Sequence, residues 1–185
     1  MVQAVSEDEQ KVSALGQIEL GKSKLMLWRR PSWNTTRLLK ELKGVTIIVT
    51  CQGDQEQPEL IAEMCSEYGI KHLRIDISGA NQRTLKDQFV LHEVKTKCRE
   101  LLTIMKNQSE VIVIHCAAGL HRTGSIGYAL VRLGSDPVLS KEDAYLALKT
   151  MREETYERVK DWRIVLAEDN IVQPLFEELN EEQQR

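Results

Sequence analysis

The sequence predicts an α/β protein with a central, mostly parallel sheet and helices on both faces. Apolar runs of strand length alternate with helical patterns through the first two thirds of the chain, and a helical block follows. Such alternation is typical of parallel sheets, because parallel neighbours need a crossover connection, usually a helix. The 185 residues suffice for one domain with a substantial core, and no internal repeat divides them.

The first half of the chain contains three expected strands separated by two helices. Apolar runs predict strands at 24–28, 45–50 and 70–77. One helix follows Pro31 and ends at Gly44, and the next begins at Pro58 and ends at Gly69. Proline is favoured at the first helical position and glycine just after the last, so these residues support the boundaries.

The second half contains one strand among several helices. A long helix is predicted over about 85–105, because its apolar residues repeat every three or four positions: Val90, Val94, Cys98, Leu101 and Met105. A buried strand follows at 111–115. Apolar stripes then predict a helix that ends at Gly134, one that Ser140 caps, one over about 159–166, and an acidic one that begins at Pro174. These four helices make the C-terminal part helical.

The expected organisation is a single domain over residues 21–179, with polar ends. Residues 1–20 show no sustained periodicity and are expected to form a loose, flexible arm, and residues 180–185 a polar tail. The acidic start is unlike a signal peptide, and no apolar run approaches the length of a membrane span. We therefore expect a cytoplasmic or nuclear protein that does not associate with membranes.

Charge and cysteine content narrow the function classes further. A net charge of −3 does not suggest a general nucleic-acid surface. The four cysteines show neither a CxxC pair nor a secreted disulfide framework, so no metal site is expected. Nothing in the sequence indicates a cofactor, and the oligomeric state stays open.

The most informative segment is 111–124, where an apolar strand runs into a loop of small residues and then a helix start. Cys116 and Arg122 are separated by five residues, and Gly119 permits a tight turn between them. Backbone N–H groups of such a loop point at an anion, and the positive end of the helix supports them. A helix N-terminus and a guanidinium also favour the thiolate form of cysteine, which is the nucleophilic form. The segment predicts phosphoryl transfer to sulfur.

These residues resemble the signature of the protein tyrosine phosphatase superfamily, His-Cys-x-x-Gly-x-x-Arg-(Ser/Thr)-Gly. Every fixed position is filled, by His115, Cys116, Gly119, Arg122, Thr123 and Gly124. The short chain is similar to the dual-specificity branch over roughly residues 24–168. The resemblance implies the fold of dual-specificity phosphatases. It further implies a cysteine-dependent phosphatase that forms a phosphocysteine intermediate and needs no cofactor. It also implies that the substrate-binding loop is formed by Ala117, Ala118, Gly119, Leu120, His121 and Arg122.

The resemblance also assigns supporting roles. His115 corresponds to a buried residue that bonds the loop and helps to hold the thiolate. Thr123 corresponds to the hydroxyl that stabilises the thiolate as it leaves the intermediate; a helix-capping role is compatible with this. Members of the family carry an Asp on a separate loop as general acid. Asp76, at the end of a strand, is the favoured candidate, whereas Asp87 falls at a helix start, where a cap is the ordinary role.

Three alternatives stay open for the substrate and activity. A phosphorylated protein fits the apolar residues of the loop better than an inositol phosphate, although Arg29, Arg30, Lys71 and Arg74 are possible sources of charge. An enzyme without a strong acid would favour phosphoanhydrides, as RNA 5′-triphosphatases do. A catalytically weak phosphate-binding protein is an alternative of another class.

Cys51 is a candidate redox residue. It ends the strand predicted at 45–50, and the carboxyl ends of neighbouring parallel strands lie side by side. A nearby thiol can trap an oxidised nucleophilic cysteine as a disulfide. Packing as a small buried residue is the equally weighted alternative.

Overall fold

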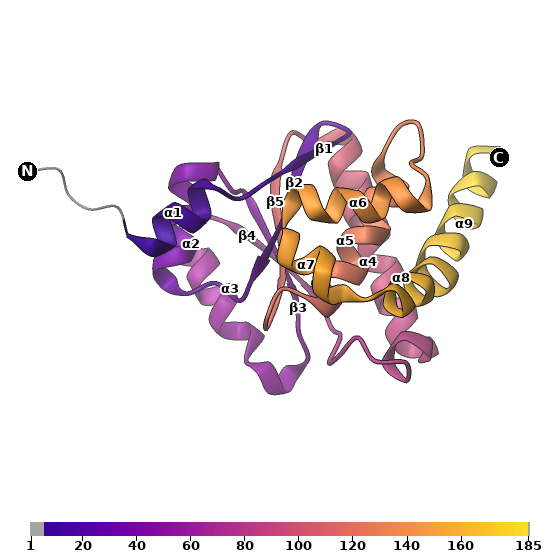
Figure 1. Ribbon diagram of the computed structural model, residues 1–185, viewed down its shortest axis with the longest axis horizontal. Coiled ribbons are helices and arrows are strands. Elements are labelled where there is room, and N and C mark those ends of the chain that lie inside the picture. Colours follow the sequence, from indigo (N-terminus) through magenta and orange to yellow (C-terminus); the bar gives the residue numbers. More distant parts are fainter. Residues whose placement is uncertain (1–5, 185) are drawn as a thin grey trace, which may run out of the picture.

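The computed structural model describes residues 6–184 and is built around a five-stranded sheet (Figure 1). Its order is β1-β2-β5-β3-β4. The strands are β1 (Ile18–Leu20), β2 (Ser23–Arg29), β3 (Ile47–Cys51), β4 (Lys71–Ile75) and β5 (Val111–Cys116). Only the edge pair β1–β2 is antiparallel, so the predicted mostly parallel sheet is confirmed.

Helices cover both faces of the sheet, as predicted. One face carries α1 (Glu7–Ser13), α2 (Trp33–Lys43) and α3 (Pro58–Glu67). The other carries α4 (Gln88–Asn107), α5 (His121–Gly134), α6 (Lys141–Met151), α7 (Glu153–Val159), α8 (Asp161–Ala167) and α9 (Gln173–Gln184). A π-helical turn, Glu168–Val172, joins α8 to α9, and short 3₁₀ turns lie at Asp54–Glu56 and Thr84–Lys86.

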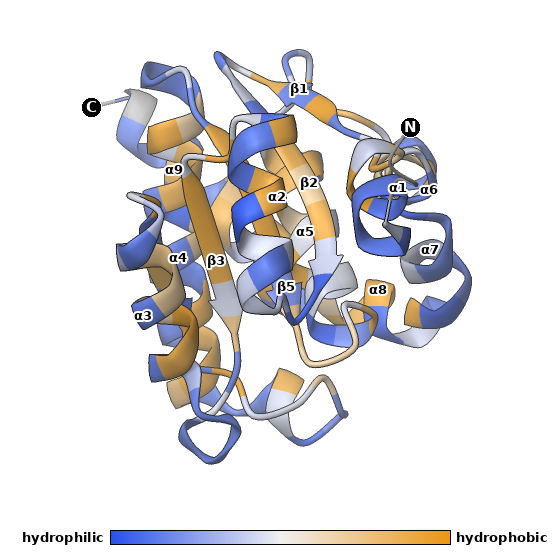
Figure 2. Cartoon of the chain, turned by 90° about the vertical axis from the view of Figure 1, so that its left-hand side faces the viewer, coloured by the Kyte–Doolittle hydropathy of each residue, from blue (hydrophilic) through white to orange (hydrophobic). Residues whose placement is uncertain are grey.

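Each central strand is apolar because it is buried on both sides (Figure 2). In β3, Ile47, Val49 and Cys51 belong to the core beneath α4 and α5, whereas Ile48 belongs to the core beneath α2 and α3. The parallel register brings the carboxyl ends of β2, β3 and β5 to one edge, where the ligands of such sheets bind.

The N-terminal segment differs from the loose arm expected over residues 1–20. Ser6 caps α1 by accepting a hydrogen bond from the Glu9 N–H, and Val12 and Leu15 are buried in the core with α2. Strand β1 extends the sheet by pairing with β2. Both elements are too short to show periodicity, and pairing with distant segments stabilises them. Residues 1–5 lie outside the described residues.

The C-terminal end also differs from the expected polar tail, because α9 continues to Gln184. Arg99 of α4 pairs with Glu178 and, at 2.5 Å, with Glu182. These ion pairs fix acidic residues that have no apolar pattern of their own. Between residues 6 and 184, no helix combines the length and the apolar character that crossing a bilayer requires.

Candidate active site

The site lies where β5 ends and α5 begins. Cys116 is the last residue of β5, and a bend over 117–120 leads into α5 at His121. Gly119 has a φ of +71°, and a Cβ added there would lie 2.2 Å from the Trp28 carbonyl oxygen. Only glycine fits this turn without strain, because it has no side chain to clash. The loop is therefore packed directly against the end of β2.

Hydrogen bonds hold the loop's carbonyl groups away from its centre. The Arg30 N–H donates to the Ala117 carbonyl at 3.1 Å. Arg152 donates to the Ala118 carbonyl at 3.0 Å and to the Gly119 carbonyl at 2.7 Å, and Thr155 donates to the latter at 2.6 Å. The N–H groups of residues 117–120 have no protein acceptor within the described part of the chain. The loop thus offers a set of donors to an anion.

Sequence reasoning missed Arg152 and Thr155. They lie 28 and 31 residues after Gly124, the last residue of the motif, where α7 begins, and no local pattern links them to it. Close packing of α7 on α5 brings Arg152 and Thr155 to the loop. The helices are so close at Gly124 of α5 that a Cβ added there would lie 2.5 Å from Val159 of α7.

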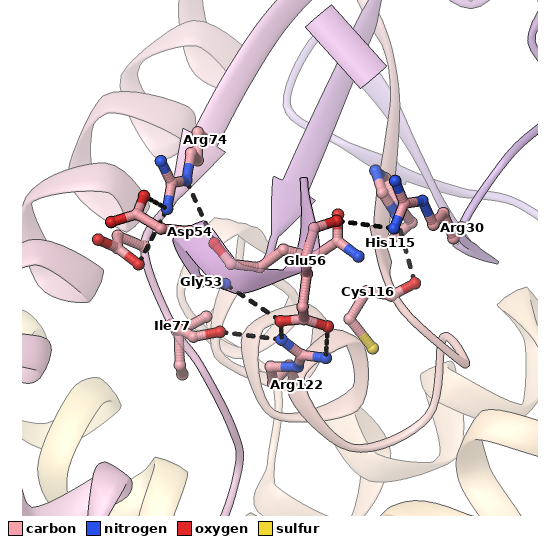
Figure 3. A network of polar contacts seen from close by, with 11 residues as sticks. Arg30, Gly53, Asp54, Glu56, Arg74, Ile77, His115, Cys116 and Arg122 are labelled. Atoms are coloured by element: carbon pink, nitrogen blue, oxygen red, sulfur yellow. Dashed lines mark hydrogen bonds and ion pairs between the residues drawn. The ribbon is translucent and has the colours of Figure 1, made fainter. Parts of the chain in front are cut away.

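Arg122 is buried and held in a fork by Glu56, which sequence reasoning also missed (Figure 3). Both terminal nitrogens of Arg122 donate to the Glu56 carboxylate, Nη2 at 2.7 Å, and Nη1 also donates to the Ile77 carbonyl at 3.0 Å. The hydrogen bond from Arg122 lowers the pKa of Glu56, while burial opposes this. Glu56 is therefore ionised at neutral pH. It orients the guanidinium by accepting from both of its terminal nitrogens.

Glu56 reaches the site from the turn that follows β3. Its carboxylate accepts from the Gly53 N–H at 3.1 Å, and its carbonyl accepts from Arg30 at 2.7 Å. Arg30, a possible substrate-binding cation from the sequence, therefore helps to hold this turn. The only signal available beforehand was an acidic residue shortly after a strand end.

His115 is fully buried and ends a directed chain of hydrogen bonds. Its Nδ1 lies 3.4 Å from the Cys116 carbonyl oxygen, which only accepts, so Nδ1 carries the proton. Nε2 then accepts from the Thr50 hydroxyl at 2.8 Å, and that hydroxyl accepts from His72 at 2.9 Å. Burial lowers the pKa of His115 to about 3. The expected role of His115 as a buried support of the loop agrees with these contacts.

Thr123 and His121 take different positions around the loop. The Thr123 hydroxyl is fully buried and has no hydrogen-bond partner among residues 6–184, which leaves it available to a group in the loop. His121, the first residue of α5, is half-buried and faces a cavity outside the loop.

Within residues 6–184, neither candidate acid forms a hydrogen bond or an ion pair with Arg122. Asp76 follows β4, the edge strand two places from β5, and pairs with Arg74 at 3.1 Å. Its side chain is 56% exposed. Asp87 caps α4 by accepting from the Phe89 and Val90 N–H groups, so its expected capping role is confirmed. Asp76 stays a prediction.

Cys51 and Cys116 end neighbouring strands. Thr50 pairs with His115 in the parallel register. The residue that follows on each strand, Cys51 on β3 and Cys116 on β5, is therefore opposite the other on the same face of the sheet. Cys51 is fully buried, and burial raises its pKa well above the usual range. All four cysteines are free thiols.

Comparison with known proteins identifies the fold. No protein-family model and no curated protein sequence matches the chain. The similar solved structures include the core catalytic domain of the PP-IP phosphatase SIW14 from S. cerevisiae in complex with citrate, PTPMT1, and Tk-PTP in the active form. Their TM-scores are 0.62, 0.63 and 0.59, at identities of 16%, 16% and 17%.

These matches cover most of each chain. SIW14 covers 90% of this chain and 91% of its own, PTPMT1 covers 89% and 99%, and Tk-PTP covers 83% and 92%. The chain therefore has the fold of the protein tyrosine phosphatase superfamily. The predicted dual-specificity-phosphatase-like architecture is confirmed.

Proposed function

We propose that the protein is a cysteine-dependent phosphatase that hydrolyses phosphomonoesters through a phosphocysteine intermediate. The observation that carries the proposal is the loop between β5 and α5, which places Cys116 and Arg122 around a set of N–H donors without protein acceptors. A protein that only bound phosphate would need the donors and the guanidinium but not the thiol.

The reaction follows from this arrangement in two steps. The Cys116 thiolate attacks phosphorus; an S–P bond forms, the bond from phosphorus to the ester oxygen breaks, and that oxygen takes a proton from an acid. Water then attacks phosphorus, the S–P bond breaks, and inorganic phosphate and the thiolate are released. Loop N–H groups and Arg122 stabilise charge on the equatorial oxygens in both steps. The Thr123 hydroxyl stabilises the thiolate as it leaves.

The substrate class stays a prediction. The exposed side chains of Ala117 and Ala118 give the loop an apolar surface, which supports a phosphorylated protein side chain as the substrate. Arg74, a possible source of positive charge for other substrates, pairs with Asp54 and Asp76 instead. A cationic cavity beside His121 favours a second candidate, a substrate with several phosphate groups, as inositol phosphates and RNA 5′-triphosphates have.

Turnover of an aryl phosphate tests the reaction. Wild-type protein should hydrolyse it with sensitivity to vanadate, and Cys116→Ser should not, while still binding phosphate through the loop and Arg122. Arg122→Lys should lose both turnover and binding, because a point charge replaces a bidentate fork. Cys65→Ala, on the other face of the sheet, is the matched control and should keep turnover.

Two results would oppose the proposal. Turnover by Cys116→Ser close to that of the wild type would exclude the mechanism. Phosphate binding by a wild type without turnover would instead identify a phosphate-binding protein. A panel of phosphotyrosine and phosphothreonine peptides, RNA 5′-triphosphate and inositol phosphates would then assign the substrate class of an active enzyme.

A further inference from the structure

A cationic cavity lies directly beside the phosphate-binding loop. It has a volume of about 510 Å³ and is lined by His121, Arg158, Lys160, Trp162 and Arg163. His121 belongs to the loop sequence, whereas the other four come from the end of α7 and the start of α8. Among the residues that the structure describes, no acidic side chain lines the cavity.

The three cations of the cavity lack counter-ions within residues 6–184. Arg158, Lys160 and Arg163 form no ion pair with any acidic residue of the described chain, whereas Arg29, Arg74 and Arg122 all have one. Asp161 lies between Lys160 and Arg163 in the sequence, but its carboxylate accepts a hydrogen bond from the Tyr145 hydroxyl at 3.3 Å. Burial and the nearby charges of Arg163, Arg158 and Lys160 lower the pKa of His121. A site with this potential attracts an anion.

Arg163, which forms one side of the cavity, is held in place by contacts with other parts of the fold. Arg163 donates to the Ala80 carbonyl at 2.7 Å and to the Val159 carbonyl at 3.2 Å, and its guanidinium stacks 4.1 Å from the Trp162 ring. Lys160 has φ +68° and ψ 141°, a backbone conformation that costs a non-glycine residue energy. The fold thus maintains a strained residue at the rim of the cavity.

We infer that this cavity binds a second phosphate group of the substrate. This selects the second of the two candidate substrates named above, here a small molecule with at least two phosphates, over a phosphorylated protein. This inference rests on the proposed function, because the first phosphate is the one that Cys116 attacks. Arg122 lies near Cys116 (Figure 3), and the residue before it in the chain, His121, lines the cavity, so neighbouring residues belong to the two sites.

The short separation favours a small molecule over a protein. Adjacent Cα atoms are about 3.8 Å apart, so residues 121 and 122 serve two anion sites that lie only side-chain lengths from each other. Phosphates on one ring or in one anhydride chain are close to one another and rigidly spaced. Phosphates on two side chains of a flexible peptide must be ordered at an entropic cost before both can bind.

Linear polyphosphates of increasing length test the inference. Inhibition of aryl phosphate hydrolysis is measured with orthophosphate, pyrophosphate, tripolyphosphate and tetrapolyphosphate. We expect tripolyphosphate to inhibit the wild type at least about tenfold more tightly than orthophosphate, because charge-assisted contacts are added. The ratio of the orthophosphate inhibition constant to the tripolyphosphate inhibition constant should fall several-fold in Arg158→Ala/Lys160→Ala. Using a ratio cancels any general loss of activity in the variant.

A matched double variant controls for net charge. Lys71 is a possible source of charge from the sequence, but it begins β4, at the end of the sheet opposite to the loop, and Lys106 lies in the last turn of α4. Lys71→Ala/Lys106→Ala therefore removes two exposed cations away from the site and should keep the wild-type ratio. Arg158→Ala alone, at an exposed position, provides a second test if the double variant unfolds. A wild-type ratio in the pocket variants would overturn the inference.

Two further measurements separate the possible failures. Calorimetric titration of the same polyphosphates into Cys116→Ser needs no turnover, so it tests the cavity even if the wild type is inactive and the proposed function fails. myo-Inositol hexakisphosphate and a doubly phosphorylated peptide are then compared. Affinity for the inositol compound should depend on Arg158 and Lys160; dependence confined to the peptide would contradict the assignment to a small molecule.

Discussion

His115 shows how the fold sets the protonation state of a single residue. It is fully buried, and its Nε2 lies 2.8 Å from the Thr50 hydroxyl, which in turn lies 2.9 Å from Nε2 of His72. Protonation would place a charge on a ring that is shielded from water. The lowered pKa of about 3 is therefore a property of the folded state alone.

Linkage gives a pH dependence with a definite sign. Between about pH 6.5 and 3 the unfolded chain binds a proton at His115 that the folded chain does not, so stability falls as pH falls. The slope from this residue is at most about 1.4 kcal/mol per pH unit. Denaturant unfolding should show a shallower slope in His115→Asn, whereas His92→Asn, at an exposed position, should match the wild type. Equal slopes in all three proteins would contradict this assignment.

Asp76 is the second residue whose chemistry can be isolated. If it is the general acid, Asp76→Asn should slow hydrolysis of a phosphopeptide far more than that of an activated aryl phosphate, because only the poor leaving group needs a proton. The fall in rate at high pH, where the acid is deprotonated, should disappear with it. Steady-state rates with both substrates across pH measure this.

Asp54→Asn is a close control, since Asp54 pairs with the same Arg74 at 2.7 Å. It removes an equal charge from the same cluster and should affect both substrates equally. A substrate-selective loss in Asp87→Asn instead would move the acid to the start of α4. Equal slowing of both substrates by Asp76→Asn would leave the enzyme without this acid.

At the scale of elements, the register of β3 against β5 determines what Cys51 can do. Neighbouring strands are about 4.8 Å apart, and Cα atoms within roughly 7 Å can be joined by a disulfide. The pairing of Thr50 with His115 brings Cys51 and Cys116 within this range. The buried Cys51 thiol is protonated, so it reacts only after Cys116 has been oxidised.

Mild peroxide should therefore inactivate the wild type reversibly. Peroxide converts the Cys116 thiolate to a sulfenic acid and is itself reduced to water; the Cys51 thiol then attacks that sulfur, and water leaves as the disulfide forms. Thiol reductant should restore activity, and peptide mass spectrometry should detect the Cys51–Cys116 pair. Cys98→Ser, a buried control in the same core, should behave like the wild type. If Cys51→Ser recovers its activity fully after peroxide treatment, and the wild type shows no Cys51–Cys116 disulfide peptide, then Cys51 is only a packing residue.

At the scale of the whole molecule, Glu168 connects the C-terminal helices. Its buried carboxylate accepts from the Tyr128 hydroxyl and from Gln173, both at 2.7 Å, and lies 3.6 Å from Arg132 and from Lys141. One side chain thus joins α5, α6, the π-helical turn and α9. The same block of helices supplies Arg152 and Thr155 to the loop, so its stability supports the site.

Removing this carboxylate should destabilise the protein globally. Glu168→Ala leaves the Tyr128 hydroxyl and Arg132 unpaired in a buried region, and we expect the free energy of unfolding to fall by about 3 kcal/mol. Glu168→Gln keeps an acceptor for Tyr128 and should lose less. Asp169→Ala, the exposed neighbour, should change little. Urea unfolding measures all three, and equal stability of Glu168→Ala and Asp169→Ala would refute the role.

The sequence by itself determined the α/β class, the central strands and the segment that carries Cys116 and Arg122. These features are local. The periodicity of strands and helices and the signature motif depend on residues that are close together in the sequence, and these residues determine the local backbone conformation. The expected cap at Asp87 belongs to the same category, because a capping side chain bonds N–H groups two or three residues away.

Only the tertiary structure decided which distant residues complete the site. Glu56 lies 66 positions before Arg122, and Arg152 lies 33 after Gly119, yet both contact their partners directly. The cationic cavity and the buried N-terminal segment arise in the same way. Such contacts depend on strand order and on how helices pack across the sheet, and the alternation of apolar and polar residues specifies neither, because many packings satisfy the same local pattern.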